Sequence, residues 1–204
     1  MTTADDARRP YRMVTRAEQH ARVRKRILDA MKEAITTKSF TSITLADIAA
    51  DAGVSVPTVH NHFSSKESLF LAAMEELGPA VLELRGDPGP GDIPAIVRGL
   101  VRAYERYGDA NWRLLPLQAE SPAVADALEA GRAGHRAWLE EVFGPLLPTP
   151  PSERRRTIDA LYAATDVGTW KLLRRDLGCS VRRTTAALDL LVRGALTGSG
   201  EAGQ

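Results

Sequence analysis

The sequence has few of the features that mark secreted, membrane-bound and catalytic proteins. It holds one cysteine, Cys179, in 204 residues, so no disulfide can form within the chain. No apolar run approaches the roughly 20 residues that cross a bilayer, and no positively charged leader precedes an apolar stretch. A Gly-rich phosphate loop, a nucleophile elbow and a run of metal ligands are also missing. We therefore expect a cytoplasmic protein that is not an enzyme, with no cofactor, metal or membrane partner.

The net charge is small, but it is unevenly distributed along the chain. The formal net charge is +1, yet residues 1–66 contain eleven Lys and Arg against seven Asp and Glu. The N-terminal third thus carries a charge of +4 and the remainder −3. Because contact with phosphates requires positive charge, this modest excess points to the N-terminal third as the part that binds nucleic acid.

Residues 44–66 have the pattern of two short helices joined by a tight turn. Thr44 is a good N-cap, and Asp47 completes an acidic variant of the capping box. Gly53 suits a left-handed residue that ends the first helix. Ser55 is a second N-cap, followed by Pro57 in the first turn of the next helix. This arrangement predicts a helix-turn-helix.

The second of these helices has a polar outer face and an apolar inner one. Val59 and Phe63 can pack inward. Such a helix suits a DNA major groove, where hydroxyl and amide groups read base edges. The alternative is a solvated helical hairpin within some other all-α protein. The polar residues on or near its exposed side are Thr58, His60, Asn61 and His62.

The remaining segments predict an all-α protein with two domains. Residues 1–20 lack apolar periodicity and are expected to be a disordered arm, whose arginines either reach DNA or remain solvated. Residues 21–67 form the DNA-binding domain, residues 68–198 a helical effector-binding and dimerisation domain, and residues 199–204 a disordered tail. The helices expected beyond the turn span 65–84, 92–108, 110–119, 121–146, 152–177 and 180–197, with a Gly/Pro break at 86–91.

Several segments of the N-terminal domain resemble the TetR family of bacterial repressors. They are Arg-Ile-Leu-Asp-Ala (26–30), Ile-Thr-Leu-Ala-Asp-Ile-Ala (43–49), Ala-Gly-Val-Ser (52–55), Thr-Val-His-Asn-His-Phe (58–63) and Ser-Lys-Glu-Ser-Leu (65–69). The resemblance implies that Thr44 and Lys66 hold phosphates of a double-stranded operator. It also implies that the groove or its rims are faced by Ser55, Val56, Pro57, Thr58, His60, Asn61 and His62.

His60 departs from the family, which usually has tyrosine at this position. A histidine can still donate to a phosphate, and more strongly when it is protonated, so we expect operator affinity to depend on pH. A metal site at His60 and His62 is disfavoured, because residues two apart on a helix point in different directions.

Two features of the C-terminal domain favour a homodimer. Small residues recur every four positions at Ala160, Ala164 and Gly168, and the last helix carries a leucine-rich stripe. Both features alternatively pack within one monomer. The TetR resemblance adds weight to dimerisation, because that family pairs its last two long helices, and two half-sites need two reading helices.

A small-molecule effector of unknown identity is the expected second partner, bound among apolar walls with a few polar groups. The ligand would favour a state whose two reading helices are wrongly spaced for successive major grooves. The alternative is an architectural or regulatory DNA-binding dimer without an effector. The candidate lining residues are Tyr104, Tyr107, Trp112, Leu115, Gln118, His135, Trp138, Tyr162, Thr165, Asp166 and Trp170.

Overall fold

The computed structural model describes the backbone of residues 8–198 and the side chains of residues 17–198. Every regular element in this range is helical, which confirms the all-α prediction. The chain divides into two compact units, Met1–Glu75 and Glu76–Gln204. The division falls inside a helix, later than the expected boundary at residues 67/68. Between residues 8 and 198, none of the helices combines the length and apolar character needed to cross a bilayer.

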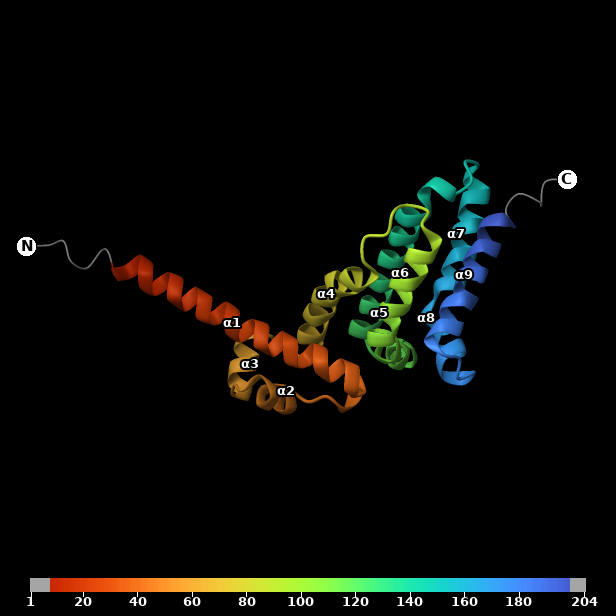
Figure 1. The fold of residues 1–204 in the computed structure, drawn as a ribbon. Coiled ribbons are helices and arrows are strands. Elements are labelled where there is room, and N and C mark those ends of the chain that lie inside the picture. Colours follow the sequence, from red (N-terminus) through yellow and green to blue (C-terminus); the bar gives the residue numbers. More distant parts are fainter. Residues whose placement is uncertain (1–7, 199–204) are drawn as a thin grey trace, which may run out of the picture. The chain divides into compact units, whose positions relative to one another are not determined.

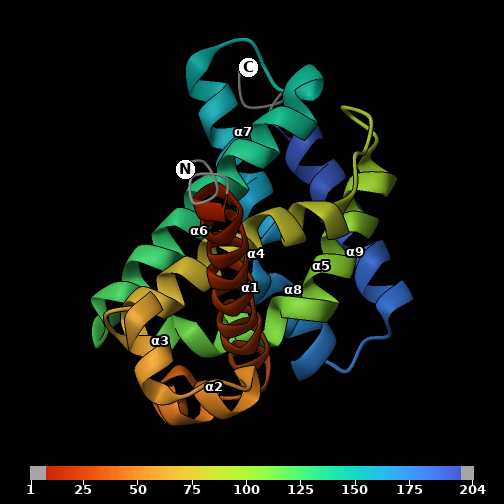
Figure 2. The ribbon, with the colours of Figure 1, turned by 90° about the vertical axis from the view of Figure 1, so that its left-hand side faces the viewer.

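The N-terminal unit is a small helical bundle. Its core holds Ile27, Met31, Ile48, Val59 and Phe70, all with no exposed surface. Helices α2 and α3 follow one another at a sharp turn against the C-terminal half of α1 (Figures 1 and 2). The elements are α1 (Arg8–Thr37), a 3-10 turn (Phe40–Ser42), α2 (Leu45–Ala52), α3 (Val56–His62) and the first half of α4 (Lys66–Arg85).

Helix α1 begins at Arg8, so the expected disordered arm is wrong for residues 8–20. This segment has no apolar face, but its arginine, methionine, alanine, glutamate and glutamine residues favour helix individually. Pro10 lies in the first turn, where a backbone N–H has no intrahelical partner to lose. Residues 1–7 and the expected tail at 199–204 lie outside the described residues.

The C-terminal unit packs its helices around one apolar core. Helices α5, α6, α7 and α9 run alongside one another (Figure 1). The expected break after α4 is confirmed, with Gly86 and Gly91 at φ values of 75° and 83°. The elements are α5 (Ile93–Leu114), a 3-10 turn (Leu115–Ala119), α6 (Pro122–Phe143), a 3-10 turn (Gly144–Leu146), α7 (Pro151–Thr165), α8 (Val167–Lys171), a π-helical turn (Leu172–Asp176) and α9 (Val181–Thr197).

Helix α5 is longer than expected, because it continues through Gly108 to Leu114. The predicted helices at 92–108 and 110–119 are thus one α-helix followed by a 3-10 turn. At Gly108, the Trp170 ring lies so close that a Cβ atom would be 2.5 Å from it. The glycine therefore serves close packing in the middle of a helix rather than ending it.

The single helix predicted over residues 152–177 is also wrong, because the chain breaks at Asp166. This residue has an extended backbone (φ −66°, ψ 151°), and its carboxylate caps α8 by accepting the Gly168 N–H at 2.7 Å. The break ends the expected stripe of small residues. Ala160 is exposed, Ala164 is buried, and Gly168 belongs to the next helix. These three residues therefore do not form one surface for a partner helix.

Candidate DNA-binding surface and effector pocket

The helix-turn-helix is built by local hydrogen bonds at its caps. The Thr44 hydroxyl accepts the Asp47 N–H at 3.1 Å, and the Asp47 carboxylate accepts the Thr44 N–H at 3.3 Å. Gly53 has a φ of 63° and ends α2, and the Ser55 hydroxyl accepts the Thr58 N–H at 3.3 Å. The predicted caps and turn are thereby confirmed. They fix the direction in which α3 leaves α2.

Helix α3 has one exposed polar side and one buried side. Val59 and Phe63 are 0% and 5% exposed, whereas His60 and Asn61 lie on the exposed side. Thr58 is half-buried, with its hydroxyl 2.8 Å from that of Ser55. His60 and Asn61 are thus the side chains of α3 that are most available to base edges.

His62 lies differently from the other polar residues of α3. Its ring centroid is 4.0 Å from that of His20 on α1, and its Nδ1 is buried without a hydrogen-bond partner. Burial lowers the pKa of His62, and the nearby His20 and Arg24 lower it further. His62 therefore packs α3 against α1, and its contact with DNA remains a prediction.

Two basic side chains of α1 lie beside the helix-turn-helix. The Arg24 guanidinium lies 4.4 Å from the centroid of the Phe63 ring at the end of α3. Arg26 reaches the turn, with Nη1 3.6 Å from where a Cβ of Gly53 would lie. Both arginines are exposed. Helix α1 therefore adds positive charge at the turn before α3 and at the end of α3.

Lys66, the second expected phosphate ligand, is largely engaged inside the N-terminal unit. Its ammonium group donates to the carbonyl oxygens of Phe40 at 3.1 Å and Ile43 at 3.2 Å. It also lies 4.4 Å from the Phe40 ring centroid. Two of its three donors thus hold the start of α4 against the segment before α2, and one remains for a phosphate.

In the C-terminal unit, His135 is the centre of a buried hydrogen-bonded chain. Its Nδ1 lies 3.1 Å from Arg85 Nη2, and its Nε2 lies 3.0 Å from the Thr165 hydroxyl. Because arginine can only donate, Nδ1 is the acceptor and Nε2 carries the proton. The Thr165 hydroxyl in turn donates to the Leu161 carbonyl at 2.7 Å. The chain is therefore complete with a neutral imidazole.

Arg85, which sequence reasoning missed, is the last residue of α4 and is 7% exposed. Its guanidinium lies 4.2 Å from the Trp138 ring centroid, and its Nε has no partner. No carboxylate among the described residues pairs with it, and burial lowers its pKa. Arg85 thus joins the end of α4 to α6 as a buried cation held by one imidazole and one aromatic face.

The His135 chain makes stability depend on pH. Burial, and then the positive charge of Arg85, lower the pKa of His135 from 6.5 to about 3. Between these values the unfolded chain binds a proton that the folded chain does not. The contribution to stability is therefore complete above about pH 6.5 and is lost as the pH falls toward 3, at up to about 1.4 kcal/mol per pH unit.

We expect urea denaturation of the wild type and of a His135→Gln variant to reveal this dependence. The difference between their free energies of unfolding should shrink as the pH falls from 7 to 4, because the variant has no imidazole to protonate. Other acidic groups titrate in both proteins and cancel in the difference. Parallel pH curves for the two proteins would show that His135 is not a buried neutral base.

The other effector candidates do not form one site. Tyr104 is buried and donates to the Thr165 carbonyl at 2.8 Å, and Trp170 is fully buried beside it. Leu115 packs on the core. Three further candidates are half-buried or exposed and lie apart from the His135 chain: Tyr107, Trp112 and Gln118. Burial thus makes Tyr104 and Trp170 part of the core.

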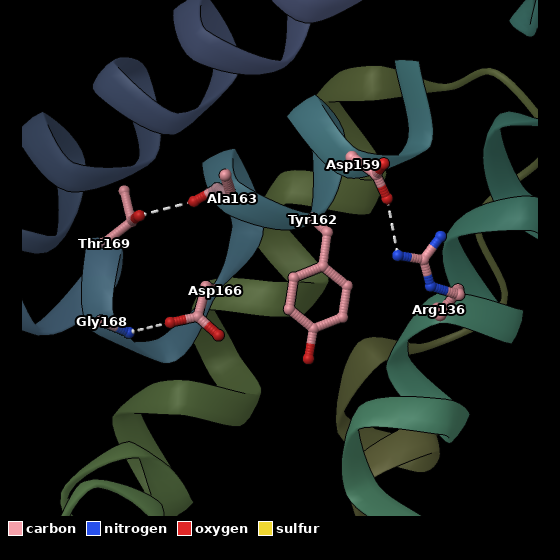
Figure 3. Close-up of a pocket in the computed structure, with 7 residues that line it drawn as sticks. All are labelled: Arg136, Asp159, Tyr162, Ala163, Asp166, Gly168 and Thr169. Carbon is pink, nitrogen blue, oxygen red and sulfur yellow. Dashed lines mark hydrogen bonds and ion pairs between the residues drawn. The ribbon is translucent and has the colours of Figure 1, made fainter. Parts of the chain in front are cut away.

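Two candidates, Tyr162 and Asp166, line a pocket of about 440 Å³ at the break between α7 and α8. Figure 3 shows them between the Arg136–Asp159 ion pair of α6 and α7 and the first turn of α8. The Tyr162 ring also meets the His135 ring edge-to-face at 5.0 Å. Sequence reasoning missed the other lining residues, Arg136, Asp159, Ala163, Gly168 and Thr169. In the described part of the chain, no cluster of three metal-ligating side chains occurs.

Comparison with known proteins finds regulators of transcription. The family described as bacterial regulatory proteins, tetR family, matches residues 27–73. The transcriptional repressor Rv3405c of Mycobacterium tuberculosis is 31% identical over 113 residues, covering 52% of this chain and 57% of that protein. The transcriptional activator FasR of Mycolicibacterium smegmatis is 27% identical over 160 residues, covering 78% and 63%. The chain thus spans less than two thirds of the length of these curated relatives.

The fold has solved counterparts over most of the chain. A transcriptional regulator from Rhodococcus sp. Rha1 superimposes with a TM-score of 0.66 at 21% sequence identity. The alignment covers 86% of this chain and 96% of that one. The similarity therefore extends through the C-terminal helices as a similarity of fold.

Proposed function

We propose that this chain, whose residues 27–73 match the tetR family of bacterial regulatory proteins, is a repressor that binds a palindromic operator as a homodimer and is released by a small-molecule effector. It is a transcriptional regulator and not an enzyme, because the family and the relatives that it matches are transcriptional regulators. The choice of repression over activation follows the higher identity to the relative named as a repressor. Transcription in vitro from a promoter that overlaps the operator should fall when the protein is added, and a rise would mean activation.

The observation that carries DNA binding is the exposed polar face of α3 beside exposed arginines of α1. His60 and Asn61 have the donors and acceptors that read base edges, and Arg24 and Arg26 lie next to the same element. Thr44 is exposed at the start of α2, but its N–H and hydroxyl both donate to the Asp47 carboxylate, so a phosphate at Thr44 would take the place of that carboxylate as their acceptor. Helix α3 would thus contact the bases, and the residues beside it would contact the phosphates.

Dimerisation is supported by large apolar side chains exposed near the C-terminus. Leu190 and Leu191 on α9 are 72% and 45% exposed, and Leu177 and Val181 just before or at the start of α9 are 63% and 44% exposed. Such residues gathered on consecutive segments are costly to leave in water and suit an interface between copies. A two-fold dimer also supplies the second reading helix that a palindromic operator needs.

We expect Leu190→Glu to convert the dimer to a monomer, because it places a charge in the apolar interface. Sedimentation velocity should show the change in mass, and operator affinity should fall at protein concentrations where the wild type is dimeric. Leu82→Glu is the matched control, since Leu82 of α4 is 50% exposed but distant from α9 in sequence. A Leu190→Glu protein that remains dimeric would remove α9 from the interface.

Release by an effector is supported by contacts that lead from the pocket to α4. Tyr162 lines the pocket and contacts His135, which is hydrogen-bonded to Arg85 at the last residue of α4. The first residue of the same helix, Lys66, is hydrogen-bonded within the DNA-binding unit. A ligand that moves Tyr162 would thereby favour one position of α4 over another, which is the differential affinity that release requires.

A further inference from the structure

We propose that the pocket between α6, α7 and α8 takes a small organic cation, an amine in its ammonium form, with the Asp166 carboxylate as its counter-ion. This inference rests on the proposed function, because it names the chemical class of the effector. The lining residues are those shown in Figure 3.

Asp166 presents one carboxylate oxygen to the pocket without a partner. Its Oδ1 accepts the Gly168 N–H at 2.7 Å, and no hydrogen bond or ion pair among the described residues engages its other oxygen (Figure 3). Glycine at position 168 keeps this arrangement open, since a Cβ there would lie 2.9 Å from Oδ1. A carboxylate in this position is a ready acceptor for an ammonium group.

Among the residues that line the pocket, only Asp166 carries a charge that is not paired, and the buried cation Arg85 lies behind the lining, where it is hydrogen-bonded to His135. Arg136 donates to the Asp159 carboxylate at 2.7 Å, and Arg132 of the same face of α6 pairs with Glu129 at 3.1 Å. Both cations near Tyr162 are thereby matched by an acid. The pocket lining retains one net negative charge, which favours a cation and disfavours an anion.

The polar groups around Asp166 are mainly acceptors. The Thr169 hydroxyl donates its proton to the Ala163 carbonyl at 2.6 Å, so its lone pairs are what it offers a ligand. Ala163 lies in the last turn of α7, whose dipole is negative at this end, and α8 begins at the same break with its positive end, so the two helix ends oppose one another. The Tyr162 ring adds an aromatic wall beside these acceptors. A ligand with N–H donors, positive charge and a small apolar body matches all of these groups.

Three aromatic probes of similar size differ in charge, and two of them, benzylamine and benzyl alcohol, also share a shape. Benzylamine is an ammonium ion at pH 7, benzyl alcohol is neutral, and benzoate is an anion. In isothermal titration calorimetry of the full chain, we expect benzylamine to bind about tenfold or more tightly than the other two. Asp166→Asn should remove that preference, and asparagine keeps the cap of α8 because it is as good an N-cap as aspartate. Asp126→Asn is the control, since Asp126 is an exposed acid of α6 outside the pocket.

The outcomes distinguish this inference from the proposed function. A wild type that prefers benzoate or benzyl alcohol, or an Asp166→Asn variant that binds benzylamine as tightly as the wild type, overturns the cation site. Operator affinity, measured separately by fluorescence anisotropy, tests effector release. If benzylamine binds at Asp166 but leaves operator affinity unchanged, the cation site holds and effector release by this pocket fails.

Discussion

Replacing Gly99 by alanine is expected to lower the free energy of unfolding of the C-terminal unit by about 3 kcal/mol. A Cβ at this position would lie 2.0 Å from the Arg85 carbonyl oxygen and 2.8 Å from its carbonyl carbon. Both are backbone atoms, so no side-chain rotation relieves the clash. Helix α5 or the end of α4 must move instead, which also disturbs the Arg85–His135 hydrogen bond.

Gly131→Ala is the matched control for this prediction. Gly131 is an exposed residue within α6, and no atom lies within 4 Å of where its Cβ would be. Alanine there should stabilise the protein by about 0.5–1 kcal/mol, because it favours helix over the unfolded chain. Urea denaturation can be followed by the fluorescence of Trp112, Trp138 and Trp170, which all lie in the C-terminal unit. Equal stabilities for the two variants would mean that α4 and α5 do not approach at Gly99.

Removing the exposed side chains of α3 is expected to have the largest effect on DNA binding. His60→Ala and Asn61→Ala should each weaken operator binding by about 1–3 kcal/mol, or roughly five- to 150-fold, if each side chain reads a base. Substitution of a base reader also relaxes the sequence preference at the position that it reads. Fluorescence anisotropy at fixed salt, with operator and unrelated DNA, measures both effects.

Gln118→Ala provides the control for the α3 variants, because it removes an exposed amide from the C-terminal unit. Its operator affinity should equal that of the wild type. The α3 variants should also keep the wild-type free energy of unfolding, because both side chains are exposed. If His60→Ala and Asn61→Ala bind the operator as tightly as Gln118→Ala does, α3 is not the reading helix.

The helix-turn-helix could be predicted from the sequence because its determinants are local. The caps at Thr44 and Ser55 and the left-handed Gly53 act within four residues of the groups that they satisfy. The same is true of the break at residues 86–91, where glycine and proline exclude a helix whatever surrounds them. The caps and the glycine turn set where α3 begins, and its sequence of polar and apolar residues sets which side is exposed.

The pocket could not be predicted in the same way, because its contacts join distant residues. Arg85 and His135 are 50 residues apart, and His135 and Thr165 are 30 residues apart. The break at Asp166 depends on a short-range cap, but aspartate inside an apolar pattern is equally compatible with an unbroken helix. Gly108 has no sequence signal that distinguishes a helix end from a site of close packing, and only the Trp170 ring decides it.

Selection of bound sequences from a pool of random DNA tests whether a homodimer reads its operator through α3. We expect the wild type to enrich two half-sites related by two-fold symmetry, with centres about one helical turn apart or a multiple of it. We also expect the protein with both His60→Ala and Asn61→Ala to lose the enriched half-sites while keeping salt-dependent binding to any DNA. Enrichment of an asymmetric site, or the same half-sites with the doubly substituted protein, would contradict a homodimer that reads its operator through α3.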